Sequence, residues 1–258
     1  MERKGKLAKI SSLISRVSNW PRVLADHAHL SRADYQCELR DGTRLNVRGG
    51  TDDRHVIFEV LVEGIYPTPF GAQSTVVDIG AHIGCFSLLA ARRGARVFSY
   101  EPFPANYKAL AGNVELNRAS AVQAFPIAVA GETGTRQLFI PDDETHSGRN
   151  SLYPRRGTRS VEIQCTTINQ IYREHGLTDV ALLKVDCQDS EYEVLYSADA
   201  TVLASTRTIV AECEVMDEGP PEWNVNALAA HLENNGFTAR VDGSFLLAAK
   251  DPAVLATW

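Results

Sequence analysis

Two glycines four residues apart follow a short apolar run, in a setting typical of a ligand-binding turn. The run includes Asp78, and Gly80 and Gly84 come shortly after it. Glycine allows a tight turn and a close approach of the backbone to a ligand, and the helix expected next leaves free N–H groups. A dinucleotide fingerprint would need glycine at His82, so this turn disfavours NAD-type cofactors. It suits S-adenosylmethionine, whose ammonium or sulfonium side Asp78 can meet.

A second carboxylate, Glu101, ends the next apolar run, 23 residues after Asp78. An acidic residue at a strand end with about this spacing can accept hydrogen bonds from both hydroxyl groups of a ribose. Glu101 also precedes Pro102 at the start of a helix, where a negative charge is favourable without any ligand. The turn and the carboxylate together favour a nucleoside cofactor, because ligands of parallel sheets bind at these strand ends.

Later strand ends supply candidates for catalysis. Asp186 follows the fourth predicted parallel strand and Glu212 the fifth, so both belong at the sheet edge that carries the glycine turn. Methyl transfer is an in-line displacement, and the enzyme mainly holds the acceptor near the methyl group. A hydroxyl acceptor loses its proton during transfer, so a carboxylate or an imidazole helps, whereas an amine must only be unprotonated. His146, in a long polar loop, is a third candidate base.

The elements that must position these residues follow a regular rhythm. Apolar runs alternate with amphipathic stretches from residue 75 to residue 214, which predicts right-handed βαβ units and an α/β fold with a mostly parallel, doubly wound sheet. The apolar stretch at 121–130 counts as one of these strands. A helix at 225–234 and a hairpin around Asp242-Gly243 follow, and we expect the hairpin to add antiparallel strands at the sheet edge.

Residues 1–70 are predicted to form a small helix and hairpin cap on an S-adenosylmethionine-binding domain at 71–258. Apolar positions at helical spacing predict a basic amphipathic helix at 6–20, which Pro21 ends. A hairpin around Asp41-Gly42 and a helix at 54–62 come next. The apolar stripe of the first helix needs a cover, which can be the main domain, a second copy in a homodimer, a ligand or an anionic membrane surface.

Over residues 35–215, the chain resembles the FkbM-type methyltransferases, a family of S-adenosylmethionine-dependent enzymes with a Rossmann-like fold. The resemblance is carried by GTDDRHVIFEVLVEGIY (50–66), VVDIGAHIGCFSLLAA (76–91), YEPFPANYKALAGNVELN (100–117), SGRNSLY (147–153), LLKVDCQDSEYEVL (182–195) and IVAECE (209–214). It implies transfer of a methyl group to a small molecule, most often to a hydroxyl group of a natural product or a sugar.

The resemblance also implies roles for individual residues. The implied cofactor site consists of Asp78, Gly80, His82, Gly84, Glu101, Asn106 and Ala128, and Ala128 would mark the adenine-side loop after the third strand. Asp186, after the fourth predicted strand, is a further candidate for cofactor binding. Asn150 and Ser151 match the family's polar loop and are expected to contact the cofactor or the acceptor. Glu191 and Trp223 are further candidates for acceptor contact. The alternative for Glu191 is a favourable charge at the start of a helix, and the alternative for Trp223 is packing over an edge of the fold.

The chain departs from the family pattern in two places. His82 stands where the family usually has asparagine, and it adds a titratable group. The family's K-I-D-V-E-G-x-E reads K-V-D-C-Q-D-S-E here, so Gln188 replaces a carboxylate and Asp189 replaces a glycine. Asp189 can restore the missing charge from the neighbouring position, and aspartate tolerates a left-handed turn better than most residues.

Composition limits the remaining function classes. The 258 residues are 44% hydrophobic with a formal charge of −6, which is ordinary for a globular protein and unfavourable for binding nucleic acid. The five cysteines form no C-x-x-C pair, and no metal site is predicted. Without a long apolar run or a signal peptide we expect a cytoplasmic protein with no stable membrane insertion. The prediction is a small-molecule O-methyltransferase, with an N-methyltransferase or a non-catalytic cofactor-binding protein as alternatives.

Overall fold

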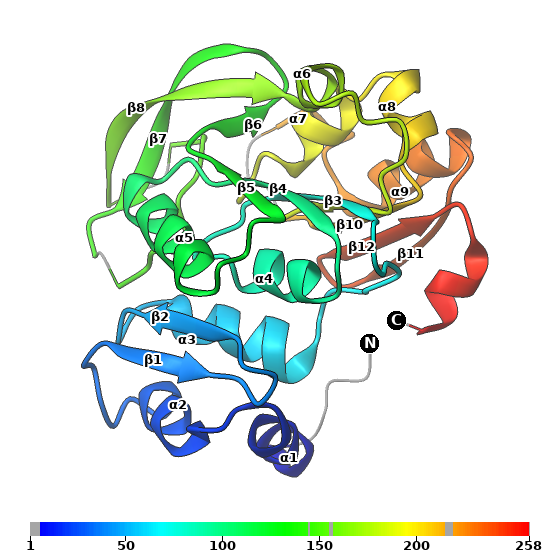
Figure 1. Cartoon of the computed structure of the whole chain (residues 1–258). Helices are drawn as coiled ribbons and strands as arrows, with labels where there is room; N and C mark the ends of the chain where they lie inside the picture. Colours follow the sequence, from blue (N-terminus) through cyan, green and yellow to red (C-terminus); the bar gives the residue numbers. More distant parts are fainter. Residues whose placement is uncertain (1–5, 144, 155–156, 215–218, 258) are drawn as a thin grey trace.

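The chain folds as an α/β protein around a seven-stranded sheet (Figure 1). The computed structural model describes residues 6–143, 145–154, 157–214 and 219–257. The strand order is β11-β12-β10-β9-β3-β4-β5. Its strands are β3 (Thr75–Ile79), β4 (Arg96–Tyr100), β5 (Val122–Phe125), β9 (Leu182–Val185), β10 (Thr208–Glu212), β11 (Thr238–Asp242) and β12 (Phe245–Ala249). All neighbours pair in parallel except β12, which is antiparallel to both β10 and β11. The predicted mostly parallel sheet with an antiparallel C-terminal hairpin is confirmed.

Helices cover both faces of this sheet, which is why the central strands are apolar along most of their length. On one face lie α6 (Ile168–Glu174), α7 (Glu191–Tyr196), α8 (Ala200–Ser205) and α9 (Val225–Asn234), packed on side chains such as Val77 and Leu183. The other face carries α4 (Cys85–Arg92) and α5 (Pro104–Leu116), with Val76 and Leu182 in its core. A short 3₁₀ helix, η2 (Pro252–Thr257), follows β12.

The strand order reverses between β3 and β9. The chain runs from β3 outward to β4 and β5 on one side, and β9 leads to β10 on the other side. The loops that follow β3 and β9 therefore leave the sheet in opposite directions and open a crevice at its carboxyl edge. The predicted cofactor turn follows β3, and Asp186 follows β9. The topology thus brings the two predicted halves of the site to one edge.

The N-terminal elements pack beneath the α4 face. They are α1 (Lys6–Arg16), α2 (Trp20–His27), β1 (Tyr35–Glu38), β2 (Arg44–Val47), α3 (Asp53–Ile57) and a π-helix, η1 (Phe58–Glu63). The hairpin prediction is confirmed, since β1 and β2 pair antiparallel. Pro21 does not end a helix at residue 20 but stands in the first turn of α2, where a missing N–H costs nothing. Leu45 and Phe58 share a core with Phe86 of α4, and the domain division at residue 70 stays a prediction.

A second, three-stranded sheet was not predicted. It contains β6 (Ala128–Ala130), β7 (Gly134–Pro141) and β8 (Thr158–Thr167) in the order β6-β8-β7. The apolar stretch at 121–130 is therefore two strands in two sheets, and its interpretation as a single strand is wrong, because Pro126 interrupts the run and lacks an N–H. Ala128, which the resemblance implied to be in a loop, begins β6.

Throughout the described part of the chain, no helix has the length and apolar character needed to cross a bilayer.

Candidate active site

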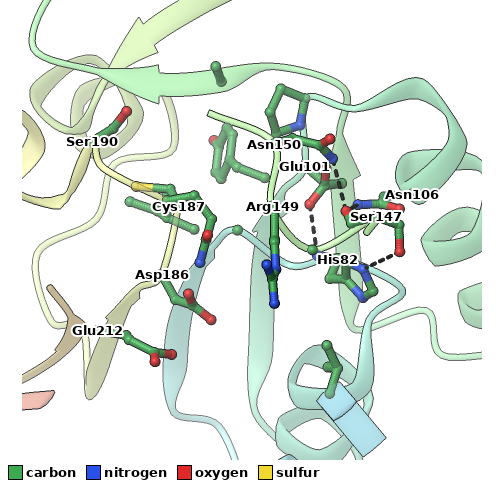
Figure 2. A pocket seen from close by; sticks show the side chains of 18 of the residues that line it. His82, Glu101, Asn106, Ser147, Arg149, Asn150, Asp186, Cys187, Ser190 and Glu212 are labelled. Atoms are coloured by element: carbon green, nitrogen blue, oxygen red, sulfur yellow. Dashed lines mark hydrogen bonds between the residues drawn. The ribbon is translucent and has the colours of Figure 1, made fainter. Parts of the chain in front are cut away.

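A cavity of about 340 Å³ opens at the carboxyl edge of the sheet, within the size range of small-molecule pockets (Figure 2). Its wall includes eight of the residues predicted from the sequence: Gly80, His82, Glu101, Asn106, Ala128, Asn150, Asp186 and Glu212. In Figure 2 Asp186 and Glu212 lie together on one side, and Glu101 and Asn106 lie on the other. The cavity therefore brings the predicted cofactor residues and the predicted catalytic carboxylates into one space.

The glycine turn lies against the end of β9. Gly80 has a φ of 76°, and a Cβ atom added there would lie 1.6 Å from the carbonyl oxygen of Asp186. Only glycine fits this contact, so the turn and the Asp186 loop are held at backbone distance. Gly84, with a φ of 88°, faces Leu110 of α5 and does not line the cavity. The two glycines therefore shape the turn in different ways.

Glu101 is buried at the end of β4 and accepts two backbone hydrogen bonds. The N–H of His82 donates to its Oε2 at 2.9 Å, and the N–H of Phe103 donates to its Oε1 at 3.0 Å. Burial raises the pKa of this carboxyl group to about 7, although both hydrogen bonds and Asn106 favour the charged form. The side chain lines the cavity, where further hydrogen-bond donors can reach it.

Lys184 lies beneath the turn and joins two predicted site residues. Its ammonium group is 3.0 Å from Asp78 and 3.4 Å from Asp186, and it donates to the carbonyl oxygen of Gly80 at 3.0 Å. Burial lowers the lysine pKa, but the two carboxylates outweigh burial and raise it above its usual value. Asp78 also accepts a hydrogen bond of 2.5 Å from Ser87 and is not in the cavity wall. Asp78 therefore supports the floor of the site.

Carboxyl groups dominate the other side of the cavity. The hydroxyl group of Tyr66 donates to Oδ2 of Asp186 at 2.6 Å, and Glu212 is the next carboxyl group along this wall (Figure 2). Burial, together with the negative charges of Asp186 and Glu59, raises the pKa of Glu212 to about 8. Tyr66 and Glu59 were missed by the sequence analysis, because no motif at short spacing links them to Asp186.

A segment of the β7–β8 connection forms the upper wall of the cavity. We call residues 145–151 the strap. Ser147, Gly148, Arg149 and Asn150 of the strap line the cavity, and Figure 2 shows the Arg149 side chain reaching down between its two sides. Ser147 accepts a hydrogen bond from Asn106 through its carbonyl oxygen at 2.9 Å. The strap therefore connects the predicted cofactor residues with the predicted acceptor residues.

Besides Asp78 and Gly84, four further predicted residues lie outside the cavity wall. His146 lines a neighbouring cavity, with Nδ1 3.7 Å from Asp52. Ser151 is buried and donates to Asp189 at 2.6 Å. Glu191 is also buried and accepts a hydrogen bond from the N–H of Cys187, and burial raises its pKa to about 8. Trp223 packs against Tyr153 and Tyr192.

Among the described residues no group of three or more histidine, cysteine or acidic side chains is arranged to hold a metal ion.

Comparison with known proteins identifies the family. A family model described as the methyltransferase FkbM domain matches residues 78–239. The chain belongs to the FkbM methyltransferase family. The match begins at Asp78 in β3 and ends in β11, so it covers most of the cavity wall but not the wall residues Asp52, His55, Val56 and Glu59. The matched range thus contains the glycine turn and the strand-end carboxyl groups of Glu101, Asp186 and Glu212.

Curated relatives agree with this membership. The methyltransferase sdnD of Sordaria araneosa is 30% identical, over 63% of this chain and 73% of the relative. The 31-O-demethyl-FK506 methyltransferase FkbM of Streptomyces tacrolimicus is 27% identical, over 67% and 76%. The AMB antimetabolite synthetase AmbE of Pseudomonas aeruginosa is 25% identical over 84% of this chain, which spans only 12% of that relative. Among solved structures, the fibrillarin pre-rRNA processing protein of Methanococcus jannaschii is 12% identical with a TM-score of 0.45, over 84% and 81%.

Proposed function

We propose that this methyltransferase binds S-adenosylmethionine in the cavity and transfers its methyl group to a hydroxyl group of a small natural product or a sugar. The observation that carries the proposal is the pairing of the Gly80 turn with the buried carboxyl group of Glu101 at the strand-order reversal. Family membership supports the methyl transfer, and the names of two relatives suggest natural-product acceptors.

The chemistry of the cavity wall fits this cofactor. Glu101 can accept hydrogen bonds from ribose hydroxyl groups in addition to its two backbone donors. Ala128, Val129, Leu138 and Leu152 form an apolar part of the wall suited to an adenine ring. Asp52, Glu59, Glu101, Asp186, Glu212 and Glu214 line the cavity as well, so the cationic sulfonium and ammonium groups meet carboxyl groups. The cofactor, when bound, supplies an activated methyl group on a positively charged sulfur.

The residues at the acceptor side have distinct proposed roles. Lys184 and Tyr66 fix the Asp186 carboxylate, which can then orient the acceptor hydroxyl group. Glu212, whose pKa lies near the pH of neutral solution, accepts the proton that this hydroxyl group loses during transfer. Asn150 and Arg149 contact the acceptor or the cofactor from the strap. His146, Glu191 and Trp223 lie outside the cavity wall and take no part in these steps.

An amine acceptor is the second candidate, and one observation favours it. The described wall carries six carboxyl groups and a single guanidinium group, that of Arg149. Such a wall attracts a protonated amine, which Glu212 or Asp186 can deprotonate before transfer. Turnover of hydroxyl acceptors and their amine analogues, compared with the same protein, distinguishes the two candidates.

Calorimetric titration tests the proposal. We expect micromolar binding of S-adenosylmethionine and of S-adenosylhomocysteine, its demethylated product, and no binding of NAD. Glu101→Ala should weaken binding by about a hundredfold, because the variant loses hydrogen bonds to a charged acceptor. Glu115→Ala, at an exposed glutamate of α5, is the matched control and should bind normally. Binding without turnover on any acceptor would instead favour a non-catalytic cofactor-binding protein, and normal binding by the Glu101 variant would refute the proposed site.

A further inference from the structure

The strap is held by two residues whose backbones are in an unfavourable conformation. His82 has a φ of 52° and Asp189 a φ of 79°, a region that residues other than glycine rarely adopt. Both side chains nevertheless contact the strap, at Ser147 and at Ser151. Backbone strain of this kind persists only where the surrounding structure requires it, and it is common at ligand clamps. Both strained residues therefore contact the strap through their side chains.

The Asp189 contact joins the far end of the strap to the turn after β9. The hydroxyl group of Ser151 donates to Oδ2 of Asp189 at 2.6 Å, and both residues are buried. Ser151 also pairs through its backbone with Phe139 of β7, so the strap ends at a fixed point. A glycine at position 189 would adopt the same φ without strain but would have no side chain to accept this hydrogen bond.

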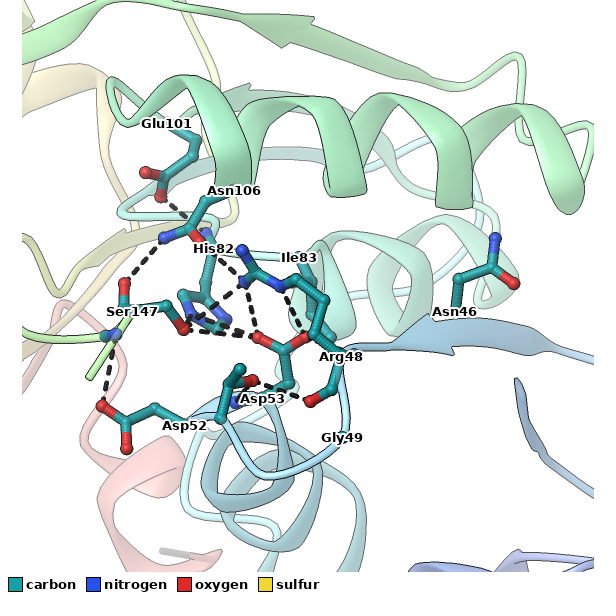
Figure 3. Close-up of polar contacts among 12 residues, drawn as sticks. Asn46, Arg48, Gly49, Asp52, Asp53, His82, Ile83, Glu101, Asn106 and Ser147 are labelled. Carbon is teal, nitrogen blue, oxygen red and sulfur yellow. Dashed lines mark hydrogen bonds and ion pairs between the residues drawn. The ribbon is translucent and has the colours of Figure 1, made fainter. Parts of the chain in front are cut away.

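The His82 contact holds the near end of the strap, within a buried polar cluster (Figure 3). Its Nε2 is 3.3 Å from the hydroxyl oxygen of Ser147 and 3.7 Å from Oδ1 of Asp53. Arg48 pairs with Asp53 at 2.6 Å and donates to Oδ1 of Asn106 at 2.7 Å. Because the backbone N–H of His82 also donates to Glu101, the same residue touches the strap and the proposed ribose carboxylate.

The N-terminal elements add a third attachment to the strap. The N–H of Asp52 donates to the carbonyl oxygen of Thr145 at 2.8 Å, and the N–H of Gly148 donates to Oδ2 of Asp52 at 3.3 Å. The strap thus rests on α3 at one end and on the β9–α7 turn at the other. The strap residues Arg149 and Asn150, which face the cavity, lie between these attachments.

We propose that His82 and Asp189 are positioning residues that hold the strap against the cofactor cavity and so set how long a bound cofactor is retained. The inference deepens the proposed function and, for its ligand, rests on it. Neither side chain needs to touch the reacting atoms, because each acts through the strap. Loosening either attachment should let the upper wall open more often, and a cofactor product should then leave faster.

Hydrogen exchange of the ligand-free protein tests the holding role by itself. Asp189→Gly and Ser151→Ala should each speed amide exchange in residues 145–151 by about tenfold, because each removes one partner of the same buried hydrogen bond. The double variant should add little to Ser151→Ala, which removes the hydrogen bond to Asp189 and also the one that Ser151 accepts from the N–H of Tyr153. Gln73→Gly, at a residue other than glycine with a φ of 65° away from the strap, is the matched control and should leave strap exchange unchanged.

Dissociation of S-adenosylhomocysteine tests the functional role. Asp189→Gly should raise its dissociation rate about tenfold without lowering the melting temperature, because the variant also relieves backbone strain. Asp189→Asn should restore slow dissociation, since asparagine tolerates a left-handed backbone and keeps an acceptor oxygen. His82→Asn should lie between the wild type and Asp189→Gly.

The possible outcomes separate the two proposals. Failure of the wild type to bind S-adenosylhomocysteine would overturn the proposed function, and the exchange data would still report on the holding of the strap. Unchanged strap exchange in Asp189→Gly would overturn the inference even if the cofactor binds. Faster amide exchange in the strap with an unchanged dissociation rate of S-adenosylhomocysteine would also overturn the inference, because the strap would then not affect how long the cofactor stays bound.

Discussion

At the scale of single residues, Glu212 gives the sharpest prediction. A base must be ionised to accept a proton, so the rate on a hydroxyl acceptor should rise with pH through about 8 and level off above it. Glu212→Gln should lower kcat about a hundredfold and abolish this rise. Steady-state rates between pH 6 and 10, with saturating S-adenosylmethionine, measure both effects. An unaltered pH profile in the variant would assign the base to another residue.

The same scale shows what could be predicted from the sequence. Gly80, Glu101, Asp186 and Glu212 were predicted because each stands at a strand end, and a parallel sheet gathers strand ends at one edge. Tyr66 could not be found this way, because it meets Asp186 across 120 positions of sequence. The pairing of Asp78 with Lys184 was not predicted, because Asp78 was interpreted as a cofactor residue and the two residues stand on strands far apart in the sequence.

At the scale of elements, the contact between the β3 turn and the end of β9 can be tested with two glycine variants. Gly80→Ala should lower the free energy of unfolding by about 3 kcal/mol or more, for two reasons. Its Cβ would collide with the Asp186 backbone, and alanine is strained at this positive φ. Gly176→Ala has a similar φ but nothing within 4 Å, so it should lose only about 1 kcal/mol. Urea unfolding of both variants isolates the collision, and equal losses would contradict it.

Element boundaries were predictable where local chemistry marks them. Asp41-Gly42 and Asp242-Gly243 each predict a hairpin, and both hairpins are present. The β7–β8 pair was missed because a long connection joins its strands and no short turn marks their pairing. Pro21 was misinterpreted because proline suits both the end of one helix and the first turn of the next.

At the scale of the whole molecule, burial of acidic side chains makes stability depend on pH. Burial raises the pKa values of Glu101 to about 7 and of Glu191 to about 8, so the folded protein holds these protons more tightly than the unfolded chain. Their contribution is therefore fully present near pH 4 and is lost as the pH rises to about 8. Between pH 5 and pH 8.5 the free energy of unfolding of the wild type should fall by about 2 kcal/mol or more relative to that of Glu191→Gln, which has no carboxyl group to titrate.

Chemical unfolding at the two pH values measures this difference. The glutamine amide keeps an oxygen that can accept the hydrogen bond from Cys187, so the variant removes the titration without removing the contact. Equal stability differences at both pH values would show that Glu191 does not titrate in this range. Glu233→Gln, on the exposed side of α9, is a suitable control.

The antiparallel strand β12 has a consequence for the order in which the protein can assemble during synthesis. Among the described strands β12 comes last along the chain, but it lies inside the sheet, between β10 and β11. Until residues 245–249 have left the ribosome, the apolar strand β10 has an unpaired edge that another chain could join. A nascent chain of this protein is therefore exposed to aggregation until nearly all of its sheet sequence has been made.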